Sequence, residues 1–280
     1  MLAMLEKNTA QPENEHLSHL EAVTACPASC THDDRPHDAD CRVDRRAFLG
    51  LTGTTMATAT GVSLFAVSGF GREAEAASLT REQRDAMTPD QVIEAMLKGN
   101  ERFATGERRD RDFLAEQQSS SAGQFPAAVV LGCLDSRTPV EVVCDLGIGD
   151  AFAARVAGNV VNDDILGSME FACAVSGAKL VVVMGHTACG AIKGAIDDVV
   201  LGNLTGLVAK IRPAIRDTAY EGERNAKNDE FVDAVARTNT TLCVAQIRER
   251  SRILRELEEK GTIKIIGCMY DLKTARVTLL

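Results

Sequence analysis

Residues 180–184 of this chain read LVVVM, and His186 follows the run at the second position. An uninterrupted apolar run of this length is typical of a strand in a parallel sheet that is covered on both faces. Residues 127–131 (AAVVL) form a second such run, and Cys133 follows it at the same spacing. Ligands of an open parallel sheet bind beyond the carboxyl ends of its strands. Cys133 and His186 can therefore meet at one edge of the sheet if their strands are neighbours.

Helix signals alternate with these strands. Residues 88–91 (TPDQ) and 138–141 (TPVE) both predict a capping-box helix start with proline at the first helical position, and the first helix should extend to about Phe103. Asn162 is expected to cap a helix that runs to about residue 175. The buried side of that helix should carry residues that recur at helical spacing: Ile165, Met169, Ala172 and Cys173.

The remaining segments continue the alternation of strand and helix. We expect a helix from about Ala188, and strands at 151–156, 263–268 and 276–279 with charged helices over about 203–217 and 230–258. This order predicts an α/β fold with a mainly parallel central β-sheet flanked by helices.

The N-terminal quarter of the chain has a different character. The pair Arg45-Arg46 precedes an uncharged stretch over residues 51–70, and Ala74-Glu75-Ala76 provides a small-x-small cleavage pattern. These features predict a twin-arginine export signal over residues 45–76, after a polar, disordered leader over 1–44 and before a folded domain over 77–280. The export machinery would then be a partner of the precursor, and the product would be periplasmic. If the signal is not cleaved, the same stretch would anchor the protein in the membrane.

Residues 77–280 contain six cysteines. An even number after an export signal could indicate disulfides, but a domain of this length can bury a sufficient core without them. Two of the six are better explained as metal ligands. The other four have largely apolar neighbours and are predicted to be small buried thiols: Cys144, Cys173, Cys243 and Cys268.

The composition also bears on partners. The net charge is −9, and the chain has two tyrosines, no tryptophan and no basic patch interleaved with aromatic residues. We therefore expect no nucleic-acid partner.

Two short motifs carry the chemistry. Cys133-Leu134-Asp135-Ser136-Arg137 follows the first strand, and His186-Thr187-Ala188-Cys189 follows the second. Two thiolates and one imidazole are the ligand set of a catalytic zinc with one open position. His186 is also the only histidine after residue 37. A closed structural zinc would usually take a fourth cysteine or histidine close by in sequence, and none is present. We predict one Zn²⁺ per chain, held by Cys133, His186 and Cys189.

Asp135 and Arg137 are the predicted catalytic pair. An aspartate beside a guanidinium stays ionised, so Asp135 could accept a hydrogen bond from water on the metal and orient it. Alternatively, Asp135 could bind the metal as a fourth ligand in a closed state. Arg137 would control which state forms, because its guanidinium group can donate hydrogen bonds to both carboxylate oxygens of Asp135. Two thiolates cancel the charge of the ion, which predicts activity that rises toward alkaline pH.

These motifs resemble those of the β-class carbonic anhydrases, over most of residues 80–280. By this resemblance Cys133, His186 and Cys189 match the zinc ligands, and Asp135 with Arg137 match the catalytic dyad. The matches to the substrate pocket of the plant-like subtype are Gln124, Phe152, Gly158 within Ala157-Gly158-Asn159, Phe171 and Gly190. Phe171 stands where that subtype carries a tyrosine, and Ala275 where glycine is common. Residues 80–105 are similar to the N-terminal arm through which the family dimerises, so the resemblance implies a homodimer or a higher even oligomer.

The reaction that the resemblance implies is reversible hydration of CO2 to bicarbonate and a proton, through attack of zinc-bound hydroxide. Because His186 is on the metal, no histidine remains to shuttle the proton, and exogenous buffer should accept it. One alternative is a related zinc enzyme that acts on another small linear molecule such as carbon disulfide. A second alternative is a zinc-holding or interaction protein without activity, which would have no use for a water-orienting Asp135.

Overall fold

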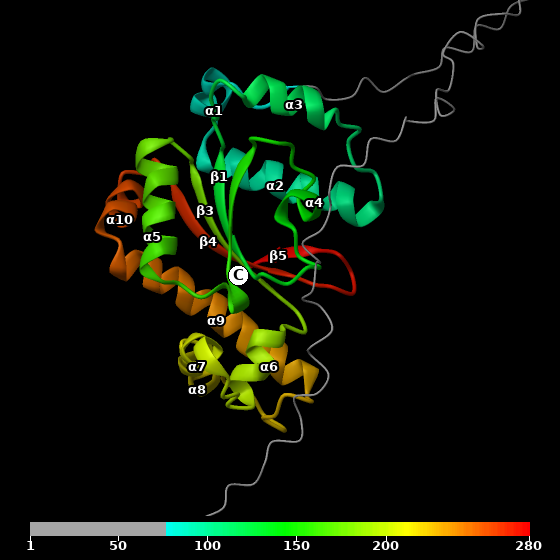
Figure 1. The fold of residues 1–280 in the computed structure, drawn as a ribbon, viewed down its shortest axis with the longest axis vertical. Helices are drawn as coiled ribbons and strands as arrows, with labels where there is room; N and C mark the ends of the chain where they lie inside the picture. The colour runs from blue at the N-terminus through cyan, green and yellow to red at the C-terminus, as the bar shows by residue number, and fades with distance from the viewer. Residues whose placement is uncertain (1–76) are drawn as a thin grey trace, which may run out of the picture. The chain divides into compact units, whose positions relative to one another are not determined.

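A computed structural model describes residues 77–280; the predicted leader and export signal, over residues 1–76, lie outside the described residues. The sheet has five strands in the order β2-β1-β3-β4-β5 (Figure 1). The first four strands in this order are parallel, and β5 is antiparallel to β4. The α/β prediction is confirmed. The strands are β1 (Ala128–Gly132), β2 (Ala151–Arg155), β3 (Leu180–His186), β4 (Lys264–Tyr270) and β5 (Val277–Leu279).

Helices cover both faces of the sheet, as the apolar runs predict (Figure 1). Alternate residues of a strand point to opposite faces. In β1, Val129 and Leu131 pack with one group of helices, whereas Ala128 and Val130 pack with the other. On the first face lie α5 (Asp163–Glu170), α9 (Asp229–Arg250) and α10 (Arg252–Glu259), and on the second lie α2 (Pro89–Thr105) and α4 (Val140–Val143).

A third cluster of buried residues lies where the strands end. It is built around α6 (Gly190–Ile196), α7 (Gly202–Ala209) and α8 (Arg212–Asp217). Cys133 and Cys189 both belong to this cluster, together with Ile192 and Ile211. The two thiols therefore sit in an apolar, well-packed environment at the carboxyl ends of β1 and β3.

Two glycines let α9 lie directly on the end of the sheet. A Cβ atom on Gly185 would come within 2.3 Å of Thr240 Oγ1, and one on Gly267 would lie 3.2 Å from Thr240 Cγ2. Gly185 precedes His186 at the end of β3, and Thr240 belongs to α9. The close approach allowed by glycine thus brings α9 next to the strand that carries the histidine.

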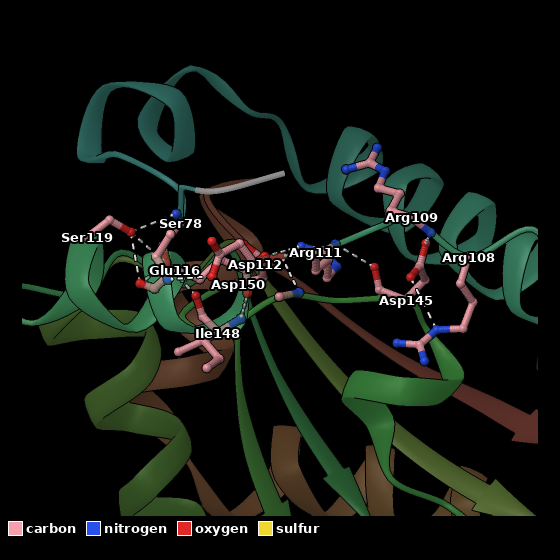
Figure 2. A network of polar contacts seen from close by, with 12 residues as sticks. Ser78, Arg108, Arg109, Arg111, Asp112, Glu116, Ser119, Asp145, Ile148 and Asp150 are labelled. Carbon is pink, nitrogen blue, oxygen red and sulfur yellow. Dashed lines mark hydrogen bonds and ion pairs between the residues drawn. The ribbon is translucent and has the colours of Figure 1, made fainter. Parts of the chain in front are cut away.

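A buried polar network fixes the segment that leads into the sheet from α2 (Figure 2). Asp145 accepts a hydrogen bond from Arg102 Nε at 2.6 Å, and Arg111 donates to Glu116 Oε1 at 2.8 Å and to the carbonyl of Asp145 at 2.8 Å. Glu116 Oε2 in turn accepts from the backbone N–H of Ile148 at 2.8 Å. The network ties α3 (Phe113–Ser120) to the loop before β2. The sequence did not predict α3, nor the short α1 (Arg81–Ala86).

One predicted helix cap is wrong. The side chain of Thr88 caps α2 in a capping box as expected, but Thr138 does not cap α4, whose N-cap is Pro139. The hydroxyl of Thr138 donates instead to the carbonyl oxygen of Asp135 at 3.0 Å. The physical reason is that the tight loop after Cys133 leaves a nearby carbonyl that competes for the hydroxyl.

Two predicted helical segments are divided, and a third changes its helical geometry. Residues 203–217 form α7 and α8, and Pro213 is in the first turn of α8, where its missing N–H is harmless. Ser251 interrupts 230–258 with extended backbone, and its hydroxyl caps α10. The helix capped by Asn162 does reach residue 175, but its last turn is a π-helix, η2 (Phe171–Val175). Within residues 77–280, none of the helices combines the length and apolarity needed to cross a bilayer.

Candidate metal centre

Three side chains converge at the carboxyl ends of β1 and β3. Cys133 directly follows β1, His186 is the last residue of β3, and Cys189 precedes α6. Their candidate ligand atoms all lie within 4.8 Å of one another, and all three residues are buried. The two Sγ atoms are 4.0 Å apart. The strands are neighbours in parallel register, with Gly132 opposite Met184, so the predicted meeting of Cys133 and His186 is confirmed.

The histidine ring is oriented for a metal. His186 Nδ1 lies 2.9 Å from the carbonyl oxygen of Thr187. A carbonyl only accepts hydrogen bonds, so Nδ1 carries the proton and Nε2 keeps its lone pair. Nε2 is buried and has no hydrogen-bond partner. A buried acceptor without a partner is costly, and a cation bound between Nε2 and the two sulfurs would relieve that cost. The residues therefore fit a zinc ion.

The two thiols differ strongly in acidity. The hydrogen bond shared with Cys189 lowers the pKa of Cys133 to about 4 against the opposing effect of burial, and the backbone N–H groups of Asp135 and Gly158 act in the same direction. The pKa of Cys189 is raised, first by its hydrogen bond with Cys133 and then by burial. Both sulfurs bind a metal as thiolates, so the proton that the pair shares must be lost when a metal binds.

The four remaining thiols of residues 77–280 are buried and free, as predicted. Burial raises the pKa of Cys144, of Cys173 and of Cys243 to about 12. Within residues 77–280, none of these four thiols belongs to the cluster of candidate metal ligands. Among the thiols of residues 77–280, Cys133 is therefore the one whose pKa is lowered.

Asp135 lies beside the cluster and forms an ion pair with Arg137. The guanidinium donates to both carboxylate oxygens, from Nε to Oδ1 at 2.9 Å and from Nη2 to Oδ2 at 2.7 Å, and the backbone N–H of Arg137 adds a third bond to Oδ1. These bonds hold the pKa of Asp135 well below its usual range. Oδ2 is 4.0 Å from His186 Nε2. The carboxylate is therefore ionised, next to the ligand atoms and engaged with Arg137.

The loop that carries Cys133 is fixed by two further groups. Arg155, at the end of β2, donates to the carbonyl oxygens of Cys133 at 2.9 Å and of Asp135 at 2.5 Å. The backbone N–H of Gly158 points at Cys133 Sγ at 3.3 Å. Gly158 has φ 66°, and a Cβ there would come within 2.7 Å of Ile211 Cδ1, so a larger residue would be strained and Ile211 would have to shift. Arg155 was not predicted from the sequence, where its one signal is a charge at the end of a predicted strand.

Other predicted pocket residues lie elsewhere. Gly190 begins α6 directly after Cys189, but Gln124 is exposed and lines a hollow with residues of α3 and the loop before β2. Phe152 and Phe171 meet edge to face, with ring centroids 6.2 Å apart, in a hollow formed by β2 and α5. Neither hollow is lined by Cys133, His186 or Cys189. Within one chain, the structure does not bring Gln124, Phe152 or Phe171 to the metal cluster.

Comparison with known proteins identifies the family of this chain. The family model described as carbonic anhydrase matches residues 128–277. Carbonic anhydrase 2 of Mycobacterium tuberculosis is 34% identical over 193 residues, which cover 68% of this chain and 92% of that protein. The carbonic anhydrase of Mycolicibacterium smegmatis is 35% identical over 197 residues, covering 68% and 93%. A structure from a study of two tetrameric β-carbonic anhydrases of Sordaria macrospora shares the fold, with TM-score 0.52 and 21% identity over 68% of this chain and 97% of that one. The chain therefore belongs to the carbonic anhydrase family, in its β class.

Proposed function

We propose that residues 77–280 catalyse the reversible hydration of CO2 to bicarbonate and a proton, with one Zn²⁺ held by Cys133, His186 and Cys189. The observation that carries this proposal is the buried ligand cluster, with ligand atoms within 4.8 Å, beside an ionised Asp135. Two thiolates and one imidazole leave a fourth position for water, which is the arrangement of catalytic zinc sites. A bound zinc supplies Lewis acidity that makes this water a nucleophile near neutral pH.

The residues around the ligands would orient the reaction. Asp135 Oδ2 faces the space beside His186 Nε2 and can accept a hydrogen bond from the attacking water, which directs a lone pair of its oxygen at the carbon of CO2. Arg137 keeps this carboxylate ionised, and its two hydrogen bonds hold Asp135 off the ligand position. This arrangement supports an open resting site rather than one closed by Asp135.

The proton of each turnover must leave the site. His186 is the only histidine after residue 37, and its free nitrogen belongs to the ligand set. The Asp135–Arg137 pair connects the site to solvent, since the Arg137 side chain is 54% exposed. Buffer molecules can therefore take up the proton at this side, and turnover at saturating CO2 should rise with buffer concentration.

Stopped-flow CO2 hydration tests the proposal, measured from about pH 6.5 to 9, the range around the pKa of zinc-bound water of roughly 7 to 9. Zinc content is measured on the same sample. We expect about one zinc per chain and activity that rises with pH and with buffer concentration. Full zinc content without CO2 hydration at any pH would contradict the proposal, and carbon disulfide would then be the next substrate to test.

We also propose that a second copy of the chain completes the substrate pocket as a homodimer or higher even oligomer, with a plant-like wall of Gln124, Phe152 and Phe171. Support comes from β2, which has no partner strand on its outer side within the described residues. Phe171 is 50% exposed and Val175 is 74% exposed on the adjoining η2. An open strand edge beside exposed apolar side chains is typical of a protein interface. Sedimentation velocity would show a dimer or tetramer if this proposal holds, and a monomer if it fails.

Finally, we propose that residues 45–76 direct export to the periplasm and are removed at Ala76. Ser78 donates from its N–H to Ser119 Oγ and from its hydroxyl to the carbonyl oxygens of Glu116 and Ile148. A chain that starts at Ala77 would keep all these contacts, so cleavage there is compatible with the fold. N-terminal sequencing of periplasmic protein should give Ala77, and replacing Arg45 and Arg46 by lysine should retain the precursor inside the cell.

A further inference from the structure

One helix contacts two loops next to the thiols: the loop of Gly158, whose N–H points at Cys133 Sγ, and the loop between His186 and Cys189. Helix α9 runs past the carboxyl ends of the strands, and two of its polar side chains reach these loops: Asn239 contacts the loop of η1 (Ala157–Asn159), and Asp233 contacts the loop between His186 and Cys189. The proposed mechanism uses neither side chain. Both side chains form hydrogen bonds with backbone groups next to the metal-ligand residues.

Asn239 acts on Cys133 through Gly158. Asn239 is 3% exposed, and its Nδ2 donates to the carbonyl oxygen of Gly158 at 2.9 Å. The N–H of the same glycine points at Cys133 Sγ at 3.3 Å. Gly158 and the following Asn159 both have left-handed backbone, with φ 66° and 44°; this conformation is strained for Asn159 and persists only where its surroundings hold the peptide between the two residues. The buried amide of Asn239 supplies this hold and thereby keeps an N–H directed at the sulfur.

Asp233 acts on Cys189 through Ala188. Its Oδ1 accepts a hydrogen bond from the backbone N–H of Ala188 at 2.8 Å. Ala188 has φ 54°, a left-handed conformation that is strained for a residue with a Cβ atom. Such strain persists only where neighbouring contacts fix it. Because Ala188 is directly before Cys189, this turn decides where the sulfur of Cys189 lies relative to His186.

From these contacts we infer that Asn239 and Asp233 are positioning residues for the metal thiolates, each acting through one backbone group. This inference rests on the zinc function proposed above. Groups that orient the first ligands typically change metal affinity by 10- to 100-fold when they are lost. Asn239 should affect the donor strength of Cys133 sulfur through the N–H···S hydrogen bond, whereas Asp233 should affect the geometry at Cys189.

The test uses the full chain loaded with Zn²⁺ or Co²⁺. Zinc affinity is measured by competition with a chelator, and the sulfur-to-cobalt charge-transfer band is recorded by absorption. Asn239→Leu removes the donor and should weaken zinc binding about 10- to 100-fold, with a shift of the band to longer wavelength because the thiolate becomes more electron-rich. Asn239→Asp keeps the size but lacks the donating amide, and it should change the band in the same direction.

Asp233 offers a rescue experiment. Asp233→Ala should weaken zinc binding about 10- to 100-fold, whereas Asp233→Asn should restore most of the affinity, because an amide oxygen still accepts from Ala188. The matched control is Ile247→Ala, on the same helix and fully buried, but packed in the cluster between α5, α9 and the sheet. It should lower the melting temperature without moving the cobalt band.

Specific results would overturn the inference. Asn239 and Asp233 variants with wild-type zinc affinity and an unchanged cobalt band would do so, and so would a band shift of equal size in Ile247→Ala. Failure of the proposed function is separate from this outcome. A wild-type protein that binds Zn²⁺ and Co²⁺ but hydrates no CO2 would refute the proposed reaction, while the affinities and spectra would still decide the positioning roles. A wild-type protein that binds neither metal would overturn both.

Discussion

The metal cluster and the aromatic hollow beside β2 differ in how completely one chain builds them. Cys133, His186 and Cys189 are all buried, with their ligand atoms within 4.8 Å. Phe171 is half exposed in an open hollow, and Gln124 is exposed in another. The first site has fixed geometry and one unpartnered acceptor, His186 Nε2. The second has apolar surface in contact with solvent.

This difference follows from what each site requires. A metal site needs ligand atoms placed within tenths of an ångström, which packed strand ends and a buried helix provide. A wall that only excludes water can be assembled from surface side chains when two copies associate. Under the proposed function, the single chain would therefore bind the metal and the oligomer would enclose the substrate.

Removing a metal ligand should have the largest effect. We expect Cys189→Ala to reduce zinc affinity by more than the ~100-fold seen for residues behind the ligands, and to abolish CO2 hydration. Zinc content and stopped-flow rates measure both. Cys173→Ala, which removes a buried thiol elsewhere, is the control and should keep its zinc. Equal zinc loss in the two variants would mean that the cluster is not the metal site.

Next in size is the loss of the orienting carboxylate. Asp135→Asn keeps the shape of the side chain but weakens its pairing with Arg137 and its acceptor strength. Turnover should fall by about 10²- to 10⁴-fold while zinc content and oligomeric state are unchanged. If the zinc is lost as well, Asp135 is mainly a ligand and the site is closed in its resting state.

The third prediction separates the two regions. Phe171→Glu places a charge in the exposed aromatic hollow and should weaken a dimer by at least ~30-fold, equivalent to about 2 kcal/mol. Activity per chain should then fall at low protein concentration, with zinc content unchanged. Sedimentation velocity and dilution-dependent kinetics measure these effects. The control is Ile253→Glu, which places the same charge at an exposed apolar position on α10. If both variants weaken the dimer equally, the proposed interface at Phe171 is wrong.

The smallest effect on activity should come from the network in Figure 2. Burial by itself would raise the pKa of Asp145, but hydrogen bonds from Arg102 and the Arg109 N–H, with the charges of Arg102 and Arg111, lower it overall. A carboxyl with a lowered folded-state pKa stabilises the fold above about pH 4, its ordinary value, and this stabilisation disappears as the pH falls through the folded-state pKa.

Asp145→Asn should therefore lower the free energy of unfolding by about 3 kcal/mol at pH 7, the usual loss when one partner of a buried ion pair is removed. The difference from wild type should narrow below about pH 4. Urea denaturation at several pH values measures this change, and kcat should remain near that of wild type. A large loss of kcat at unchanged zinc content would show that the network takes part in the site.

The sequence alone determined the α/β class, the parallel strands and the metal-ligand set. These follow from local patterns: an apolar run predicts a buried strand, and the residue two positions after it must lie at the carboxyl edge of a parallel sheet. The caps of Thr88 and Asn162 were predictable for the same reason, since both bonds span three residues.

Only the tertiary structure decided the rest. The Thr138 hydroxyl does not cap α4 because it donates a hydrogen bond to the carbonyl oxygen of Asp135. Arg155, Asp233 and Asn239 act on loops that are 20 or more residues away in sequence or belong to another element, and no spacing rule connects such positions. The separation of Gln124 and Phe171 from the metal cluster likewise depends on packing between distant segments. Local sequence patterns determine which residues follow each strand. The packing of α9 and β2 against the strand ends determines which side chains hold those residues in place.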